Sequence, residues 1–217
     1  MQSNVSDIRL PVALQTLRKA LHAKGEQLYK HSILCAEIAR HLADAAEFGC
    51  GMTPQKAYCA GLVHDVGKLY IPDAILQKPA RLTDSEWELI RLHSIYGVQF
   101  VKGTPLEEFS DVIGLHHERP DGNGYPYRRS GSEVTADARL IQVADQTAAI
   151  LEDRPYRRRI GHPGIVIQEL APTVEMCFPD HVKAMLEALR VVAEQHAHSA
   201  YEPQGLGEFG GAQGVMP

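Results

Sequence analysis

The stretch Leu62-Val63-His64-Asp65-Val66-Gly67-Lys68 decides how the rest of this sequence is interpreted. It completes a helical segment that Thr53 opens as an N-cap, with Pro54 at the first helical position. Neighbouring residues on a helix point about 100° apart, so His64 and Asp65 cannot duplicate one another. An imidazole beside a carboxylate therefore predicts a pair of metal ligands, in which one group binds a single ion and the carboxylate can bridge two.

Further histidines and one further aspartate fall where the apolar stripe of a helix would carry a hydrophobic residue. Neutral imidazoles and carboxylates are the ligands of a borderline transition metal. Seven such groups are too many for one ion, which predicts two metals that share a carboxylate, a common device for hydrolysing phosphate esters. Each group alone could be a hydrogen-bonded core residue, but burying all seven without metal would leave many polar atoms unpaired. The candidate ligands are His31, His64, Asp65, His93, His116, His117 and Asp145.

Helical periodicity dominates the chain, and no stretch alternates convincingly, so the sequence predicts an all-α fold, a helical bundle around the dinuclear centre. A capping box at Thr83 and Glu86 opens a helix expected to run through Val101. Residues 69–82 are expected to be a connector with one short helical turn. The other helices are expected over 28–45, from 54 into the 62–68 stretch, towards 116–117, over about 135–152, and from 182 onward. We expect an N-terminal helical extension at 1–24, one domain at 25–201, and a glycine-rich tail at 202–217.

Composition narrows the classes of function. The 217 residues carry a formal net charge of −5, so no strongly basic surface for long nucleic acid is expected. The four cysteines form no CxxC pair and predict no disulfide framework. Residues 1–24 hold no apolar run of signal-peptide length, and no run in the chain is long enough to span a membrane. The sequence therefore predicts a cytoplasmic protein without a membrane partner.

A second motif follows the paired histidines, where residues 116–126 read HHERPDGNGYP. Glycine, proline and asparagine at this density are typical of a turn. The motif is either a plain helix–helix connector or a loop that its own two histidines place beside the metals. In the second case Tyr125 would offer a ring for stacking on a base. Lys68 would similarly be either a solvated lysine or a cation for a phosphoryl oxygen.

Together these motifs resemble the HD-GYP family of the HD phosphohydrolase superfamily. The resemblance covers about Gln27 to Arg159 and includes HDVGK, His93, HHERPDGNGYP, the VAD at 143–145 and DRPYR at 153–157. It implies a mostly helical fold around metal ions. It also implies phosphodiesterase activity on cyclic di-GMP, which yields linear pGpG and sometimes GMP.

The resemblance also assigns roles. It implies that His31, His64, Asp65 and Asp145 bind the first metal, and that Asp65, His93, His116 and His117 bind the second. Lys68 matches a lysine that contacts the scissile phosphate, so Asp65 and Lys68 are the expected catalytic residues. Tyr125, Arg154 and Arg157 match positions that hold the nucleotide, although the two arginines could instead belong to a solvated basic run.

Three positions depart from the family pattern. Gln27 replaces a glutamate that supports a third metal in some members, and this favours two metals. Ala148 and Leu34 stand where an aspartate and an arginine are common, which puts the groups that support the ligands in doubt. The expected ions are Fe or Mn, with Ni or Zn as alternatives.

The implied mechanism is in-line attack on phosphorus by a hydroxide that bridges the metals. Two alternatives stay open at this stage. The chain could be a cyclic di-GMP receptor with little turnover, or a phosphohydrolase for another cyclic dinucleotide. A homodimer or a signalling partner protein is equally open.

Overall fold

The computed structural model describes residues 5–45, 51–152 and 163–199. Within these ranges every regular element is a helix, so the all-α prediction is confirmed. The α-helices are α1 Val5–Lys24, α2 Glu26–Ala45, α3 Pro54–Val63, α4 Asp73–Leu76, α5 Asp84–Arg91, α6 His93–Val101, α7 Ser110–Leu115, α8 Ala136–Leu151, α9 Pro163–Cys177 and α10 Val182–Ser199. The short 3-10 helices are η1 Val66–Tyr70, η2 Glu107–Phe109, η3 Gly131–Glu133 and η4 Pro179–His181.

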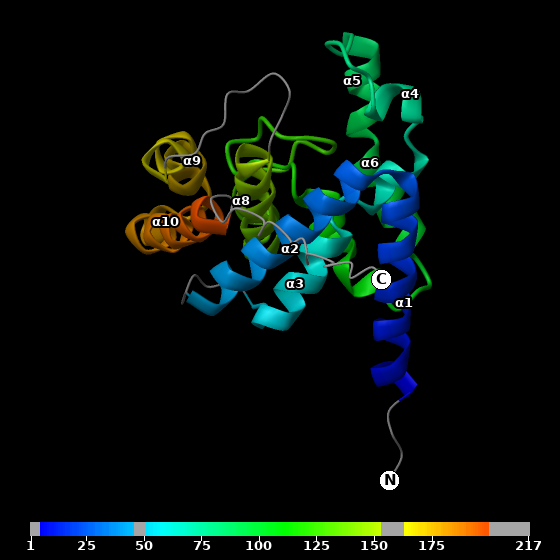
Figure 1. Cartoon of the computed structure of the whole chain (residues 1–217), viewed down its shortest axis with the longest axis horizontal. Coiled ribbons are helices and arrows are strands. Elements are labelled where there is room, and N and C mark those ends of the chain that lie inside the picture. Colours follow the sequence, from blue (N-terminus) through cyan, green and yellow to red (C-terminus); the bar gives the residue numbers. More distant parts are fainter. Residues whose placement is uncertain (1–4, 46–50, 153–162, 200–217) are drawn as a thin grey trace, which may run out of the picture.

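The centre of the bundle is formed by α2, α3 and α8, whose apolar faces share one core (Figure 1). A Cβ atom on Gly61 would lie 2.7 Å from Ala36 Cα, so the glycine lets α3 approach the backbone of α2 closely. Helix α1 runs along one side of this centre, α9 and α10 lie side by side on the other, and α4 and α5 project at one end. Leu17 and Leu21 of α1 are buried in the same core.

The HDVGK motif spans the end of one helix and the start of a turn. Helix α3 ends at Val63, His64 is its C-cap, and Lys68 lies on η1. The expectation that Lys68 continues the helix of His64 is therefore wrong. A Cβ atom on Gly67 would lie 1.8 Å from the carbonyl oxygen of His93. Only glycine lets η1 and α6 meet this closely, and the contact brings His93 to Asp65.

The helix expected from residue 84 through Val101 is interrupted. The Thr83 capping box is present, with both reciprocal hydrogen bonds, but α5 ends at Arg91 and α6 begins at His93. At Leu92 the turn tightens, because its amide donates to the carbonyl of Leu89 at 3.2 Å. The ring of His93 also bonds to the Ile90 carbonyl, at 2.7 Å. The interruption turns the His93 ring towards the other candidate ligands.

The remaining helices agree with their sequence signals, with one addition. The connector 69–82 contains the short α4, and α8 and α10 occupy the expected segments. Helix α9 was not predicted. No helix in the described ranges has the length and apolar character needed to cross a lipid bilayer. The proposed boundaries at 24/25 and 201/202 stay predictions, and the tail 202–217 lies outside the described residues.

Candidate metal centre

Two groups of potential ligands meet at the centre of the bundle. Asp65 belongs to both groups, and within each group one donor atom per residue lies within 4.8 Å of the others. The first group comes from α2 and the end of α3, and the second from α6 and the turn after α7. The groups are His31, His64 and Asp65, and Asp65, His93, His116 and His117.

In the first group the contacts converge on Asp65 and Asp145. The Nε2 atom of His64 lies 3.2 Å from Asp65 Oδ2, and Nε2 of His31 lies 2.9 Å from Asp145 Oδ1. Asp145 Oδ1 is also 3.7 Å from His64 Nε2. Asp145 comes from the middle of α8, so a third helix adds a carboxylate beside this group.

The histidines of the second group lie near the other carboxylate oxygen of Asp65, Oδ1. Nε2 of His93 lies 3.3 Å from Asp65 Oδ1, and Nε2 of His116 lies 4.0 Å from the same oxygen. The two Nε2 atoms of His93 and His116 are 3.3 Å apart. The ring centroid of His117 is 4.1 Å from that of His116. All seven predicted ligands are therefore brought together, and the two oxygens of Asp65 face different groups.

Three of the histidines are oriented by backbone carbonyls. Nδ1 of His64 lies 2.6 Å from the carbonyl of Gly61, Nδ1 of His93 lies 2.7 Å from that of Ile90, and Nδ1 of His116 lies 3.0 Å from that of Ile113. A carbonyl oxygen only accepts hydrogen bonds, so these Nδ1 atoms carry the proton. Nε2 is then the ring nitrogen of each that faces Asp65 and can bind a metal.

The unpaired atoms of the site fit bound cations. Asp65 Oδ1 and His64 Nε2 are buried and have no hydrogen-bond partner within the described residues. Unpaired polar atoms are rare in a protein interior and costly. Imidazole nitrogens and carboxylate oxygens aimed at a common point are a donor set for divalent transition metals. The arrangement of Asp65 between the two groups suits a pair of ions.

The local electrostatics differ between the two groups. Burial opposes the charged form of His31 and His64, but the neighbouring carboxylates outweigh it and raise the pKa of both rings. Burial lowers the pKa of His93 to about 4 and that of His117 to about 3. Burial, with the neighbouring His117, also lowers the pKa of His116 well below its usual value. The three imidazoles of the second group are therefore neutral at physiological pH, ready to bind a cation without losing protons.

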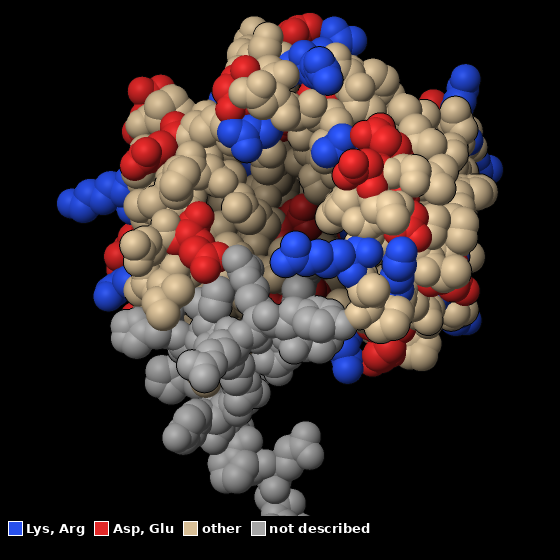
Figure 2. All heavy atoms as spheres, turned by 90° about the horizontal axis from the view of Figure 1, so that it is seen from above, with Lys and Arg blue, Asp and Glu red and all other residues tan. Residues whose placement is uncertain are grey.

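Lys68 lies at the edge of the site. Its Nζ contacts Asp65 Oδ2 at 2.5 Å, and although burial favours the neutral amine, Asp65 outweighs it and raises the pKa of Lys68. The side chain of Lys68 is 23% exposed and that of Asp145 is 17% exposed, so the site reaches solvent on this side. Figure 2 shows a hollow on one face of the molecule, with acidic side chains in its depth and lysine and arginine side chains at its rim.

The loop after His117 folds back onto the site. The ring of Tyr125 stacks on His117, with centroids 4.6 Å apart and planes inclined by 25°. A Cβ atom on Gly124 would lie 2.4 Å from the backbone nitrogen of Arg119, so the tight return requires glycine there. The motif is thus a loop placed beside the candidate ligands and not a plain connector.

Three side chains near the site were not recognised from the sequence. Glu118 is fully buried and accepts hydrogen bonds from the amides of Tyr127 and Arg129. Glu152 accepts from Nδ1 of His31. The guanidinium of Arg91 lies 5.4 Å from the centroid of the Tyr125 ring. Of these, only Glu118 could have been noticed in the sequence, as a charged residue inside a motif of turn residues. Glu152 and Arg91 reach the site only through the packing of the helices.

Two of the predicted nucleotide-binding residues, Arg154 and Arg157, lie outside the described residues. Their role stays a prediction. The described cysteines, Cys35, Cys59 and Cys177, are all buried and free, as expected for a chain without a disulfide framework.

Comparison with known proteins places this geometry in a family. Residues 15–164 match the model of the HD domain. The chain is 40% identical over 145 residues to the 3′3′-cGAMP-specific phosphodiesterase 1 of Vibrio cholerae, covering 65% of this chain and 33% of the relative. It is 32% identical over 218 residues to the cyclic di-GMP phosphodiesterase PA4108 of Pseudomonas aeruginosa, covering 99% of this chain and 46% of the relative. The chain thus spans between a third and a half of these relatives' length.

Solved structures agree on the fold. The HD domain of the phosphodiesterase PgpH from L. monocytogenes has a TM-score of 0.61 at 15% identity, covering 82% of this chain and 97% of that chain. Bd1817, an HDG"Y"P protein from Bdellovibrio bacteriovorus, has a TM-score of 0.53 at 20% identity, covering 76% of this chain and 51% of that chain. The clustered histidines and aspartates therefore lie on a helical scaffold that these proteins share. The chain belongs to the HD domain family, as its resemblance to the HD-GYP proteins predicted.

Proposed function

We propose that this chain is a metal-dependent phosphodiesterase that hydrolyses cyclic di-GMP to linear pGpG. The observation that carries the proposal is the position of Asp65. Its Oδ2 faces His64 and its Oδ1 faces His93, so one carboxylate connects two groups of ligands. Two bound divalent ions would polarise a phosphoryl oxygen and make water available as a nucleophile near neutral pH.

The residues of the chain have distinct tasks in this proposal. His31, His64 and Asp145 hold the first ion with Asp65, and His93, His116 and His117 hold the second. Fe or Mn are the favoured ions, as a mixed imidazole and carboxylate set suits both. Lys68, whose ammonium already lies beside Asp65 at the solvent-facing edge, neutralises charge on the phosphate that reacts there.

The substrate assignment rests on the loop and on the relatives. Tyr125 stacks on His117 and presents its aromatic ring beside the site, which suits a purine base. Among the curated relatives, PA4108 is named for cyclic di-GMP and matches 99% of this chain. Arg154 and Arg157 are proposed to hold the rest of the nucleotide.

A second candidate substrate has its own support. The Vibrio cholerae relative, at 40% identity over 145 residues, is named as specific for 3′3′-cGAMP. A cyclic dinucleotide with one adenine would use the same metals and the same scissile phosphate. Discrimination between the two substrates would then depend on contacts to the second base.

Turnover of purified protein tests the proposal. The metal-loaded protein is incubated with cyclic di-GMP or with 3′3′-cGAMP, and linear products are separated by chromatography. We expect cyclic di-GMP to give pGpG, and Asp65→Ala to lose both metal and activity while helical circular dichroism is retained. Binding of cyclic di-GMP without turnover would instead identify a receptor. Faster turnover of 3′3′-cGAMP would reassign the substrate.

A further inference from the structure

His31 is oriented differently from the other histidines of the centre. The Nδ1 atoms of His64, His93 and His116 bond to backbone carbonyls three residues earlier in the chain. The Nδ1 atom of His31 instead lies 2.9 Å from Oε1 of Glu152, a side chain 121 residues further along the sequence. The orientation of this ring therefore depends on a residue that substitution can remove.

Glu152 and Asp145 hold the two nitrogens of the same ring. Glu152 is the C-cap of α8 and lies seven residues, about two helical turns, beyond Asp145. Asp145 Oδ1 is 2.9 Å from Nε2 of His31, while Glu152 Oε1 is at Nδ1. The side chains of His31 and Glu152 are only 9% and 14% exposed, so water competes little for this contact.

One turn before Glu152, α8 carries no second carboxylate that could accept a hydrogen bond from His31. Ala148 lies one turn before Glu152 on α8 and is fully buried, but its methyl group accepts no hydrogen bond. The ring of His31 separates Glu152 from Asp65, since Nε2 lies 3.7 Å from Asp65 Oδ2 and Nδ1 faces Glu152. Glu152 is therefore not a direct neighbour of Asp65, and its hydrogen bond to the centre is made to His31.

We propose that Glu152 is a positioning residue for the first metal. Its carboxylate accepts the Nδ1 proton of His31, fixes the tautomer and the ring angle, and leaves the Nε2 lone pair for the ion. This inference rests on the metal centre of the proposed function, but it concerns ion affinity and does not require that the substrate is correctly identified.

Mn²⁺ titration of metal-free protein tests the inference without any turnover. Free Mn²⁺ is followed by its electron paramagnetic resonance signal, which separates two binding steps. Loss of an outer partner of a metal-binding histidine costs about 10–100-fold in metal affinity. We expect Glu152→Ala to weaken one step by this factor and to leave the other unchanged.

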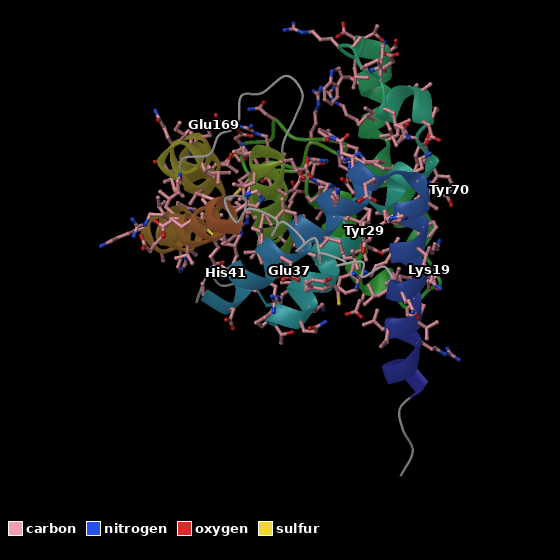
Figure 3. The ribbon with its side chains drawn as sticks, viewed as in Figure 1. Lys19, Tyr29, Glu37, His41, Tyr70 and Glu169 are labelled. Atoms are coloured by element: carbon pink, nitrogen blue, oxygen red, sulfur yellow. The ribbon has the colours of Figure 1, made fainter. Side chains whose placement is uncertain are left out.

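Two further variants distinguish the effect of the hydrogen bond from the effect of the negative charge and from a nonspecific effect of substitution. Glu152→Gln keeps a carbonyl acceptor for Nδ1 without the negative charge, so its affinity should lie close to that of the wild type. Glu37→Ala removes an exposed carboxylate from α2, the helix of His31 (Figure 3). Glu37 forms an ion pair with Arg40 there. This variant should bind both ions as the wild type does. Circular dichroism of each metal-free variant monitors the fold.

The outcomes are distinguishable. Two unchanged steps in Glu152→Ala, or an equal loss in both steps, would overturn the positioning role. A Gln variant as weak as the Ala variant would show that charge and not the hydrogen bond is responsible, which also contradicts it. A wild-type protein that binds neither Mn²⁺ nor Fe²⁺, Ni²⁺ or Zn²⁺ would instead refute the metal centre and with it the proposed function.

Discussion

Glu118 offers a sharp test of how the loop beside the metal centre is held. Its side chain is fully buried at the first turn after His117. One carboxylate oxygen accepts the amide of Tyr127 at 2.5 Å, and the other accepts the amide of Arg129 at 3.0 Å. The carboxylate therefore joins the start of the loop to its end and encloses the segment that carries Tyr125.

The magnitude follows from the two amides that lose their acceptor. A buried donor left unsatisfied costs about 1–3 kcal/mol, so Glu118→Ala should lower the free energy of unfolding by about 2–6 kcal/mol. Glu118→Gln keeps one acceptor oxygen, but its NH₂ group faces the second donor, and we expect about half that loss. Both hydrogen bonds are only partly buried, so the loss should lie towards the lower end of this range.

Urea unfolding of the metal-free protein, followed by circular dichroism, measures both losses without interference from metal binding. The matched control is again Glu37→Ala, whose exposed ion pair with Arg40 should contribute less than about 0.5 kcal/mol. The reasoning is refuted if Glu118→Ala unfolds within about 0.5 kcal/mol of the wild type, because the cost of unsatisfied buried amides excludes such a result.

Three other outcomes are expected. Gly67→Ala should lower the melting temperature and weaken metal binding, because the new Cβ would overlap the carbonyl of His93. Gly51→Ala is the control and should change neither, because nothing lies within 4 Å of its new Cβ. Equal effects of the two substitutions would contradict the argument that η1 and α6 require glycine at residue 67. Lys68→Ala should reduce kcat more than it raises KM, since the contact strengthens in the transition state; steady-state kinetics that show only a KM change would assign the lysine to binding. In metal-free protein, burial holds the pKa of His93 at about 4 and that of His117 at about 3, below the value of about 6.5 in an unfolded chain. Unfolding therefore takes up protons between about pH 4 and 6.5. The free energy of unfolding should fall as the pH is lowered through this window. A proton NMR titration of the metal-free protein checks this directly, and His93 and His117 rings that take up protons near pH 6.5 would show that they are not held neutral.

The candidate metal ligands could be singled out from the sequence because the signals that mark them are local. His31 shares a helical stripe with Cys35 and Ile38, and the structure buries all three on the same face of α2. The capping box at Thr83 is equally local, since its two hydrogen bonds join residues three apart. Interactions within one helical turn depend only on how far apart two residues are in the chain, and a single sequence gives that spacing directly.

The geometry around those ligands depends on the packing of helices. Leu92 interrupts a helix that its periodicity predicts as continuous, because His93 turns towards Asp65 and η1 packs against α6 at Gly67. Lys68 leaves the axis of α3 for the same reason and contacts Asp65 from a 3-10 turn. Hydrophobic periodicity predicts which face of a helix is apolar. It does not predict where a close contact with another backbone makes the helix end.

By itself, the sequence determined the helical class and the seven candidate ligands, since these follow from residue types and their spacing along helices, and its motifs indicated the family by resemblance. Only the tertiary structure decided that Asp65 presents one oxygen to each group of histidines. It alone brought Glu152 to His31 across 121 residues and buried Glu118 beneath the loop. Those contacts arise from the distances and angles at which α2, α6 and α8 cross, and these are set by the packing of the whole core and not by any local pattern.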